Sequence, residues 1–124
     1  MTVNSYRDLR VWQKGMDLVV TGYEVAKQFP QSELYGLASQ IQRAAVSIPA
    51  NIAEGHGREH LGDYMHHLSI ANGSLMELET HFLLAERLGY LKIESLNRLL
   101  DQTAEVGRML AGLIRSLKNS RPGS

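Results

Sequence analysis

The chain has 124 residues and a mass of 13.9 kDa, which suits a single domain with a sizeable hydrophobic core. Basic and acidic residues number 13 each, so no overall charge attracts nucleic acid. The sequence contains no cysteine, which excludes a disulfide framework and a thiolate nucleophile. No apolar run approaches the roughly 20 residues that span a bilayer, and Met1 to Arg10 do not resemble a signal peptide. We therefore expect a cytoplasmic protein without a membrane partner.

Apolar residues recur at helical spacing along the whole chain. The pattern breaks at Pro30, at Gly55-His56-Gly57 and at Gly89. It predicts four helices, over residues 8–29, 33–54, 61–88 and 93–117, with Asp8 as the first N-cap and a frayed tail over 119–124. Short connections force consecutive helices to lie antiparallel. The expected fold is an all-α, up-and-down four-helix bundle formed by a single domain over residues 1–124.

The first predicted helix carries two apolar faces. The broader face, which we expect to point inward, comprises Leu9, Trp12, Met16, Val19, Val20, Tyr23 and Ala26. A second stripe repeats every seven residues at Val11, Leu18 and Val25, interleaved with Gly15 and Gly22. A monomeric bundle needs one buried face per helix, so this stripe predicts an interface between copies of the chain. The third helix adds Met65, Met76 and Leu83 as interface candidates. The alternative is an unusually wide core.

A polar stripe runs along the second predicted helix, which also contains Pro49 at a cost of roughly 3 kcal/mol. The stripe and its expected partners on the third helix are Gln40, Arg43, Ser47, Asn51, Glu54, Ser74 and Glu77. Antiparallel packing around Gly57 sets Gln40 beside Glu77, Arg43 beside Ser74, and Asn51 beside His66 or His67. These residues form either a buried hydrogen-bond network between two helices or a surface for a partner or ligand.

The sequence shows no pattern typical of catalysis or metal binding. A di-iron bundle requires two Glu-x-x-His pairs, and the nearest approach is a single Asp63-x-x-His66 pair. There is no zincin motif, no phosphate-binding loop and no Gly-x-Ser-x-Gly nucleophile elbow. We therefore expect no enzymatic activity, no catalytic residue, no cofactor, no metal site and no small-molecule substrate.

Positive charge gathers near the C-terminus, where no acidic residue follows Glu105. The candidate nucleic-acid contacts are Arg108, Arg115, Lys118 and Arg121. Cations near a helix C-terminus each gain about 0.3–1 kcal/mol from the helix dipole, which explains them without any partner. In a cyclic oligomer the same residues would instead form a ring, and many weak phosphate contacts would act together on RNA. The sequence leaves both interpretations open.

Several motifs resemble a known family. They are Tyr35-Gly36-Leu37, Ser39-Gln40-Ile41, the run from Arg43 to Gly55 that ends in Ser47-Ile48-Pro49-Ala50-Asn51-Ile52-Ala53-Glu54-Gly55, Ile70-Ala71, Gly73-Ser74-Leu75, Glu77-Leu78-Glu79-Thr80 and Leu88-Gly89-Tyr90-Leu91. Over roughly residues 6–117 the chain resembles bacterial four-helix bundle proteins encoded in 23S rRNA intervening sequences. The resemblance implies a left-handed bundle, a homopentamer and no enzymatic activity. Gln42, where the family usually has an arginine, lowers the basic charge.

The expected function is that of a non-enzymatic oligomeric bundle, a structural or interaction module whose first partner is a second copy of itself. RNA or a nucleic-acid-associated protein is a further candidate partner. A more distant similarity to accessory proteins of diversity-generating retroelements gives the alternative, a nucleic-acid-binding accessory protein of that type.

Overall fold

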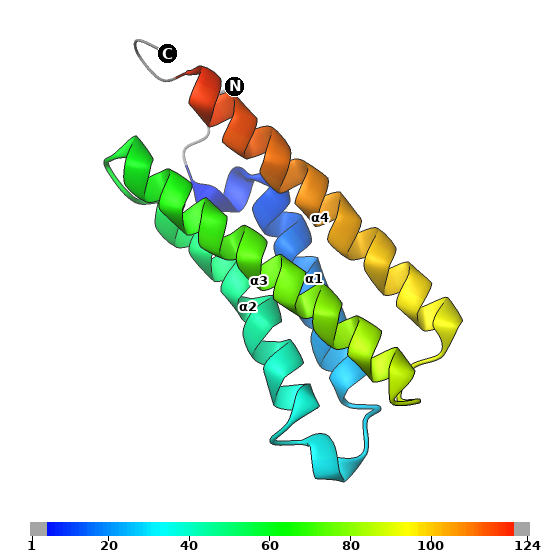
Figure 1. Ribbon diagram of the computed structural model, residues 1–124. Helices are drawn as coiled ribbons and strands as arrows, with labels where there is room; N and C mark the ends of the chain where they lie inside the picture. The colour runs from blue at the N-terminus through cyan, green and yellow to red at the C-terminus, as the bar shows by residue number, and fades with distance from the viewer. Residues whose placement is uncertain (1–4, 121–124) are drawn as a thin grey trace.

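A computed structural model describes residues 5–120 (Figure 1). Its four α-helices are α1 (Arg10–Ala26), α2 (Leu37–His56), α3 (Leu61–Arg87) and α4 (Ile93–Asn119). Single 3-10 turns, η1 (Tyr6–Asp8) and η2 (Gln31–Glu33), precede α1 and α2, and the described residues contain no strand. Consecutive helices run antiparallel around a common hydrophobic core. The predicted all-α, up-and-down four-helix bundle is confirmed.

The helix ends agree with the predicted ones to within about one turn, and the differences have local causes. Asp8 is not the N-cap of α1, because it lies within η1 and α1 begins after Leu9 without a side-chain cap. Gly89 ends α3 as predicted: its φ of 82° suits glycine, and the Tyr90 amide donates to the Ala85 carbonyl at 2.9 Å. Helix α4 continues to Asn119, and residues 121–124 of the expected tail lie outside the described part of the chain.

Each helix packs on two neighbours. Helices α2 and α3 share the most extensive contact and α1 and α4 the least, whereas within residues 5–120 the backbones of α1 and α3, and of α2 and α4, stay more than 8 Å apart between Cα atoms. In the view of Figure 1, α3 lies in front of α1 and α2. The outer surface therefore has four faces, each shared by two adjacent helices. The face shared by α1 and α2 lies opposite the face shared by α3 and α4.

Helix α1 buries the stripe that the sequence analysis placed in an oligomer interface. Val11, Leu18 and Val25 are 5%, 1% and 9% exposed and belong to the core. They do not form an interface between copies, so that prediction is wrong. The broader face is divided: Met16, Val20 and Tyr23 point outward and are 43%, 57% and 40% exposed, whereas Ala26 is buried and Leu9, Trp12 and Val19 pack against the core as predicted.

The two glycines between the buried residues explain this orientation. A Cβ atom at Gly15 would lie 3.6 Å from Pro49 Cβ, and one at Gly22 would lie 3.5 Å from Ile41 Cγ2. Both distances are ordinary van der Waals contacts, so a small residue fits at each position and the backbone of α1 lies close to α2 along this stripe. The close approach buries Leu18 fully and leaves Met16, Val20 and Tyr23 exposed.

Pro49 is buried inside α2, and the helix continues past it to His56. Proline provides no amide hydrogen, so one intrahelical bond is lost. Its ring packs against the backbone of α1 at Gly15, and this burial of apolar surface offsets part of the cost. Gly15 and Pro49 therefore act as a matched pair at the contact between α1 and α2.

Candidate interaction surfaces

A network of four polar side chains lies in the seam between α2 and α3. The hydroxyls of Ser47 and Ser74 are 2.8 Å apart. Asn51 Nδ2 donates to the Ser47 carbonyl at 2.9 Å and to Ser47 Oγ at 3.1 Å. His67 Nδ1 lies 3.0 Å from Asn51 Oδ1. Antiparallel packing around Gly57 predicts Asn51 beside His66 or His67, and the partner in the structure is His67.

The hydrogen bonds of Asn51 determine which ring nitrogen of His67 carries a hydrogen. Because Asn51 uses its amide nitrogen on Ser47, its Oδ1 accepts, and Nδ1 of His67 must carry the hydrogen. Ser47 Oγ accepts from Asn51, and either hydroxyl of the Ser47–Ser74 pair can donate to the other. His67 thus contacts an amide and not a hydroxyl, and no serine here is activated as a nucleophile. The network joins two helices.

The other predicted members of the seam lie on the surface. Gln40, Arg43, Glu54 and Glu77 are all exposed. The expected bonds from Gln40 to Glu77 and from Arg43 to Ser74 do not form within residues 5–120, because buried Ala44 occupies the seam at that height and turns Arg43 outward. That part of the prediction is wrong.

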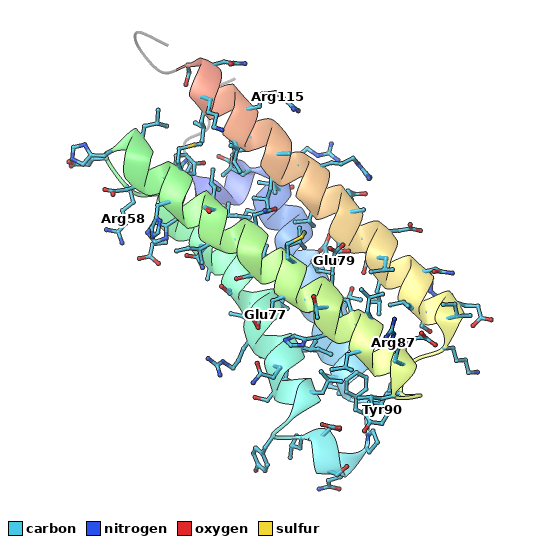
Figure 2. All side chains as sticks on the ribbon, viewed as in Figure 1. Arg58, Glu77, Glu79, Arg87, Tyr90 and Arg115 are labelled. Atoms are coloured by element: carbon cyan, nitrogen blue, oxygen red, sulfur yellow. The ribbon has the colours of Figure 1, made fainter. Side chains whose placement is uncertain are left out.

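Two of these surface residues pair within their own helix or the turn after it. Glu54 accepts a 2.7 Å bond from Arg58, and Glu77 lies 3.4 Å from His81 (Figure 2). Both pairs are exposed at the carboxylate, where ion pairs contribute little to stability. The stripe of α2 is therefore part network and part open surface.

The outward face of α1 joins α2 in an apolar surface, here named the α1/α2 patch. It consists of Met16, Val20 and Tyr23 from α1 and Val46 from α2, which is 42% exposed. A hollow of about 400 Å³ opens beside Tyr23 and Val46. Sequence reasoning missed this surface because it placed the three α1 residues inside. Gly15 and Gly22 were the signal that marks the opposite side of α1 as the buried one.

A second apolar surface, the α3/α4 patch, lies on the opposite side of the bundle. It consists of Met76 and Leu83, 47% and 45% exposed, with half-buried Met65 further along α3. Thr103 donates a 2.7 Å hydrogen bond to Glu79. The Glu79 side chain lies between α3 and α4 in Figure 2. These three α3 residues were predicted as interface candidates, and the structure places them on the surface, where that role stays a prediction.

A cationic strip follows the outer side of α4 towards its C-terminus. Arg108, Arg115 and Lys118 are exposed, and none of them forms an ion pair within the described range. Arg115 and Lys118 line a hollow of about 350 Å³ together with Asn72 of α3, and Arg115 lies towards the C-terminal end of α4 in Figure 2. Arg121, the fourth predicted contact, lies outside the described residues.

The profile of the 23S rRNA-intervening sequence protein family matches residues 7–112. The chain belongs to this family. The protein is similar to a crystallised protein of unknown function from the S23 ribosomal protein family of Bacteroides thetaiotaomicron, at 25% identity and a TM-score of 0.78. That match covers 84% of this chain and 97% of the other. No curated protein matches.

In this member of the intervening-sequence family, the perturbed titratable groups do not converge on a cleft. The pKa of the Glu33 carboxyl is lowered by hydrogen bonds from the Leu37 amide and the Tyr90 hydroxyl, and the bond to Glu33 raises the pKa of Tyr90. Burial raises the pKa of Tyr64 at the other end of the bundle. Residues 5–120 contain no group of three or more side chains suited to holding a metal ion. Nor does any helix in that range have the length and apolar character needed to cross a membrane.

Proposed function

We propose that this protein is a non-enzymatic module that works by self-association and binding, and that it assembles into a homopentamer. The observation that carries the proposal is the α1/α2 patch, where four large apolar side chains share one face and are each at least 40% exposed. Scattered apolar residues are ordinary on a surface, but a contiguous group marks an interface. Methionine and tyrosine are enriched in such interfaces. The subunit number of five rests on the family resemblance.

The α1/α2 patch is tested by placing a charge in its centre. Val20 is 57% exposed, so Val20→Glu is tolerated by the folded subunit but places a carboxylate in any interface. We expect Val20→Glu to dissociate the oligomer in sedimentation experiments while helical content by circular dichroism stays unchanged. Gln102→Glu is the matched control, since it adds the same charge at an exposed site on the face between α1 and α4. A Val20→Glu protein that assembles like the wild type would show that the patch is not the interface.

A second candidate function is that of a nucleic-acid-binding accessory protein of retroelement type. The cationic strip favours it, because exposed arginines and lysines without ion-pair partners are free to contact phosphates. Repetition of the strip on every subunit would compensate for the zero net charge of the chain.

The strip is tested with structured RNA in gel-shift experiments at several salt concentrations. We expect Arg115→Glu combined with Lys118→Glu to abolish binding while assembly remains intact, because both residues lie near the end of α4 and away from the apolar patches. Arg98→Glu, an exposed arginine near the start of α4, is the control. If the wild-type protein binds no RNA at low salt, the strip has no role in RNA binding, and its cations are explained by their interaction with the helix dipole.

A further inference from the structure

A hollow of about 350 Å³ lies between α3 and α4 near the C-terminal end of α4. The side chains that line it are Asn72, Ala111, Ile114, Arg115, Lys118 and Asn119. They supply two cations, two amides and an apolar wall, and they include no carboxylate. The larger hollow of about 490 Å³ between α1 and α4 contains the carboxylates of Glu24 and Asp101 beside Arg98, so it does not favour an anion. Of these two hollows, the one between α3 and α4 suits an anionic ligand.

The surroundings of this hollow are positively charged although the whole chain is neutral. Neither residues 64–76 of α3 nor residues 106–119 of α4 include an acidic side chain, whereas the α4 stretch contains Arg108, Arg115 and Lys118. These three cations are exposed and form no ion pair within the described residues. Two full positive charges at Arg115 and Lys118 outweigh the roughly half negative charge that the helix dipole places at the end of α4. An anion can therefore bind beside this end of α4.

Asn72 adds a group that can recognise more than charge. It is exposed on α3, and its amide makes no hydrogen bond within residues 5–120. The amide offers both donors and an acceptor, and α4 contributes Ala111 and Ile114 as an apolar wall. At Gly73, next to Asn72, a Cβ atom would meet nothing within 4 Å, so the surface beside the amide is unobstructed.

We infer that this hollow binds an unpaired adenine nucleotide of single-stranded RNA. The inference rests on the RNA binding proposed for the cationic strip and specifies the ligand. Arg115 and Lys118 hold a phosphate, the base lies against Ala111 and Ile114, and Asn72 bonds the edge of the base. An asparagine amide matches N6 and N7 of adenine with one acceptor and one donor. A volume of about 350 Å³ lies at the lower end of the range for ligand pockets, about 300–1,000 Å³, and suits one nucleotide.

The hollow favours a single strand over a duplex. In an A-form RNA duplex the major-groove edges of the bases lie in a deep, narrow groove that side chains cannot read, whereas unpaired bases are splayed out. Only an unpaired base can enter a hollow between two helices. Arg108 precedes Arg115 by two turns, about 10 Å along α4, and can contact another phosphate of the same strand. The phosphate contacts then position the strand, and Asn72 gives the preference for a base.

Fluorescence anisotropy tests the inference with labelled oligoadenylate, oligouridylate of the same length and a blunt RNA duplex. We expect the wild type to bind oligoadenylate about tenfold more tightly than oligouridylate, the effect of one bidentate base contact, and more tightly than the duplex. Asn72→Ala should remove the preference for adenine and leave the affinity for oligouridylate unchanged. Asn97→Ala is the matched control, because Asn97 is an exposed asparagine of α4 outside the hollow.

A second variant separates the hollow from its charges. Ala111→Leu fills the hollow without changing any charge, and the fold tolerates it because Ala111 is exposed on a helix. We expect Ala111→Leu to weaken oligoadenylate binding to the level of oligouridylate and to keep the salt dependence of the wild type. Arg115→Ala should instead weaken the binding of both oligonucleotides by the same factor and lower the salt slope. Helical content by circular dichroism is measured for every variant.

The outcomes separate this inference from the proposed RNA binding. If the wild type binds RNA but does not distinguish oligoadenylate from oligouridylate and the duplex, the strip binds RNA and the hollow does not. An adenine preference that survives both Asn72→Ala and Ala111→Leu also overturns the inference. Adenosine monophosphate is the competitor, and displacement of oligoadenylate at equal nucleotide concentration would assign the hollow to a free nucleotide instead of RNA. If the wild type binds no RNA at all, the proposed RNA binding fails first and the inference fails with it.

Discussion

The Tyr90 hydroxyl donates a 2.8 Å hydrogen bond to Glu33 Oε2, and the other carboxylate oxygen of Glu33 accepts from the Leu37 amide at 3.1 Å. Glu33 therefore satisfies a free amide at the start of α2 and ties it to the connection between α3 and α4. Tyr90 lies at the lower end of the bundle in Figure 2, and its ring also packs near Phe29. One carboxylate thus joins the connection between α1 and α2, the start of α2, and the connection between α3 and α4.

The two hydrogen bonds of Glu33 make the stability of the fold depend on pH in the acidic range. The bonds to Glu33 need the ionised carboxylate and hold its pKa below the ordinary value of 4.5. A lowered pKa in the folded state gives a contribution that is complete above pH 4.5 and is lost as the pH falls through the lowered value. We expect the Tm difference between wild type and Glu33→Gln to be largest near pH 7 and to shrink below pH 4.5. A difference that stays constant down to pH 3 would contradict the assignment, and Glu59→Gln, at an exposed site, serves as control.

Leu18 and Val20 test the orientation of α1. Leu18 is 1% exposed, so Leu18→Glu buries a carboxylate without a partner, which costs several kcal/mol. We expect Leu18→Glu to lose most of its helical circular dichroism, whereas Val20→Glu keeps it. If both variants remain folded and only Leu18→Glu dissociates the oligomer, the two faces of α1 are assigned the wrong way round.

Local signals in the sequence predicted most of the fold. Gly89 stops α3 because glycine accepts positive φ, and short connections dictate antiparallel neighbours. The choice between the two apolar faces of α1 was not local, because hydrophobicity alone favoured Met16 and Tyr23. It depended on the packing of α1 against α2, where Gly15 lies beside the ring of Pro49. A reading that treats Gly15 and Gly22 as marks of close helix approach would have found the buried face.

The sequence predicted which residues of α2 and α3 lie at the same level along the bundle, but it did not predict how far α2 is rotated about its own axis. The position of the intervening turn placed Asn51 beside His66 or His67, and His67 is its partner. Which side chains point into the seam depends on a small rotation of α2 about its axis. That rotation follows from the packing of Ala44, Ala45 and Ile48 in the core, which no single-helix pattern reveals. Arg43 consequently lies outside.

Two substitutions of glycine by alanine should have opposite effects, measured by urea unfolding in the monomeric Val20→Glu background. At Gly73 a Cβ atom would meet nothing within 4 Å, so Gly73→Ala should raise the free energy of unfolding by about 0.5–1 kcal/mol through helix propensity. At Gly55 a Cβ atom would lie 2.8 Å from His67 Cβ, so Gly55→Ala should destabilise the fold. Equal effects of both changes would refute the close contact between α2 and α3 at Gly55.

The polar network is tested by Asn51→Ala and Arg43→Ala in the same background. Asn51→Ala leaves Nδ1 of His67 without its acceptor, and we expect a loss of about 1–2 kcal/mol in the free energy of unfolding. Arg43 is exposed and bonds nothing within the described subunit, so Arg43→Ala should change that free energy by less than about 0.5 kcal/mol. A larger loss for Arg43→Ala than for Asn51→Ala would mean that the arginine, and not the asparagine, joins the helices.

The mass of the native wild-type protein tests the central claim most directly. Sedimentation equilibrium or native mass spectrometry over a range of concentrations should show a discrete assembly of five 13.9 kDa subunits, because the two exposed apolar patches are covered only when copies associate. A discrete assembly with another subunit number would correct the stoichiometry and keep the self-association. A single species of 13.9 kDa at every concentration would contradict it.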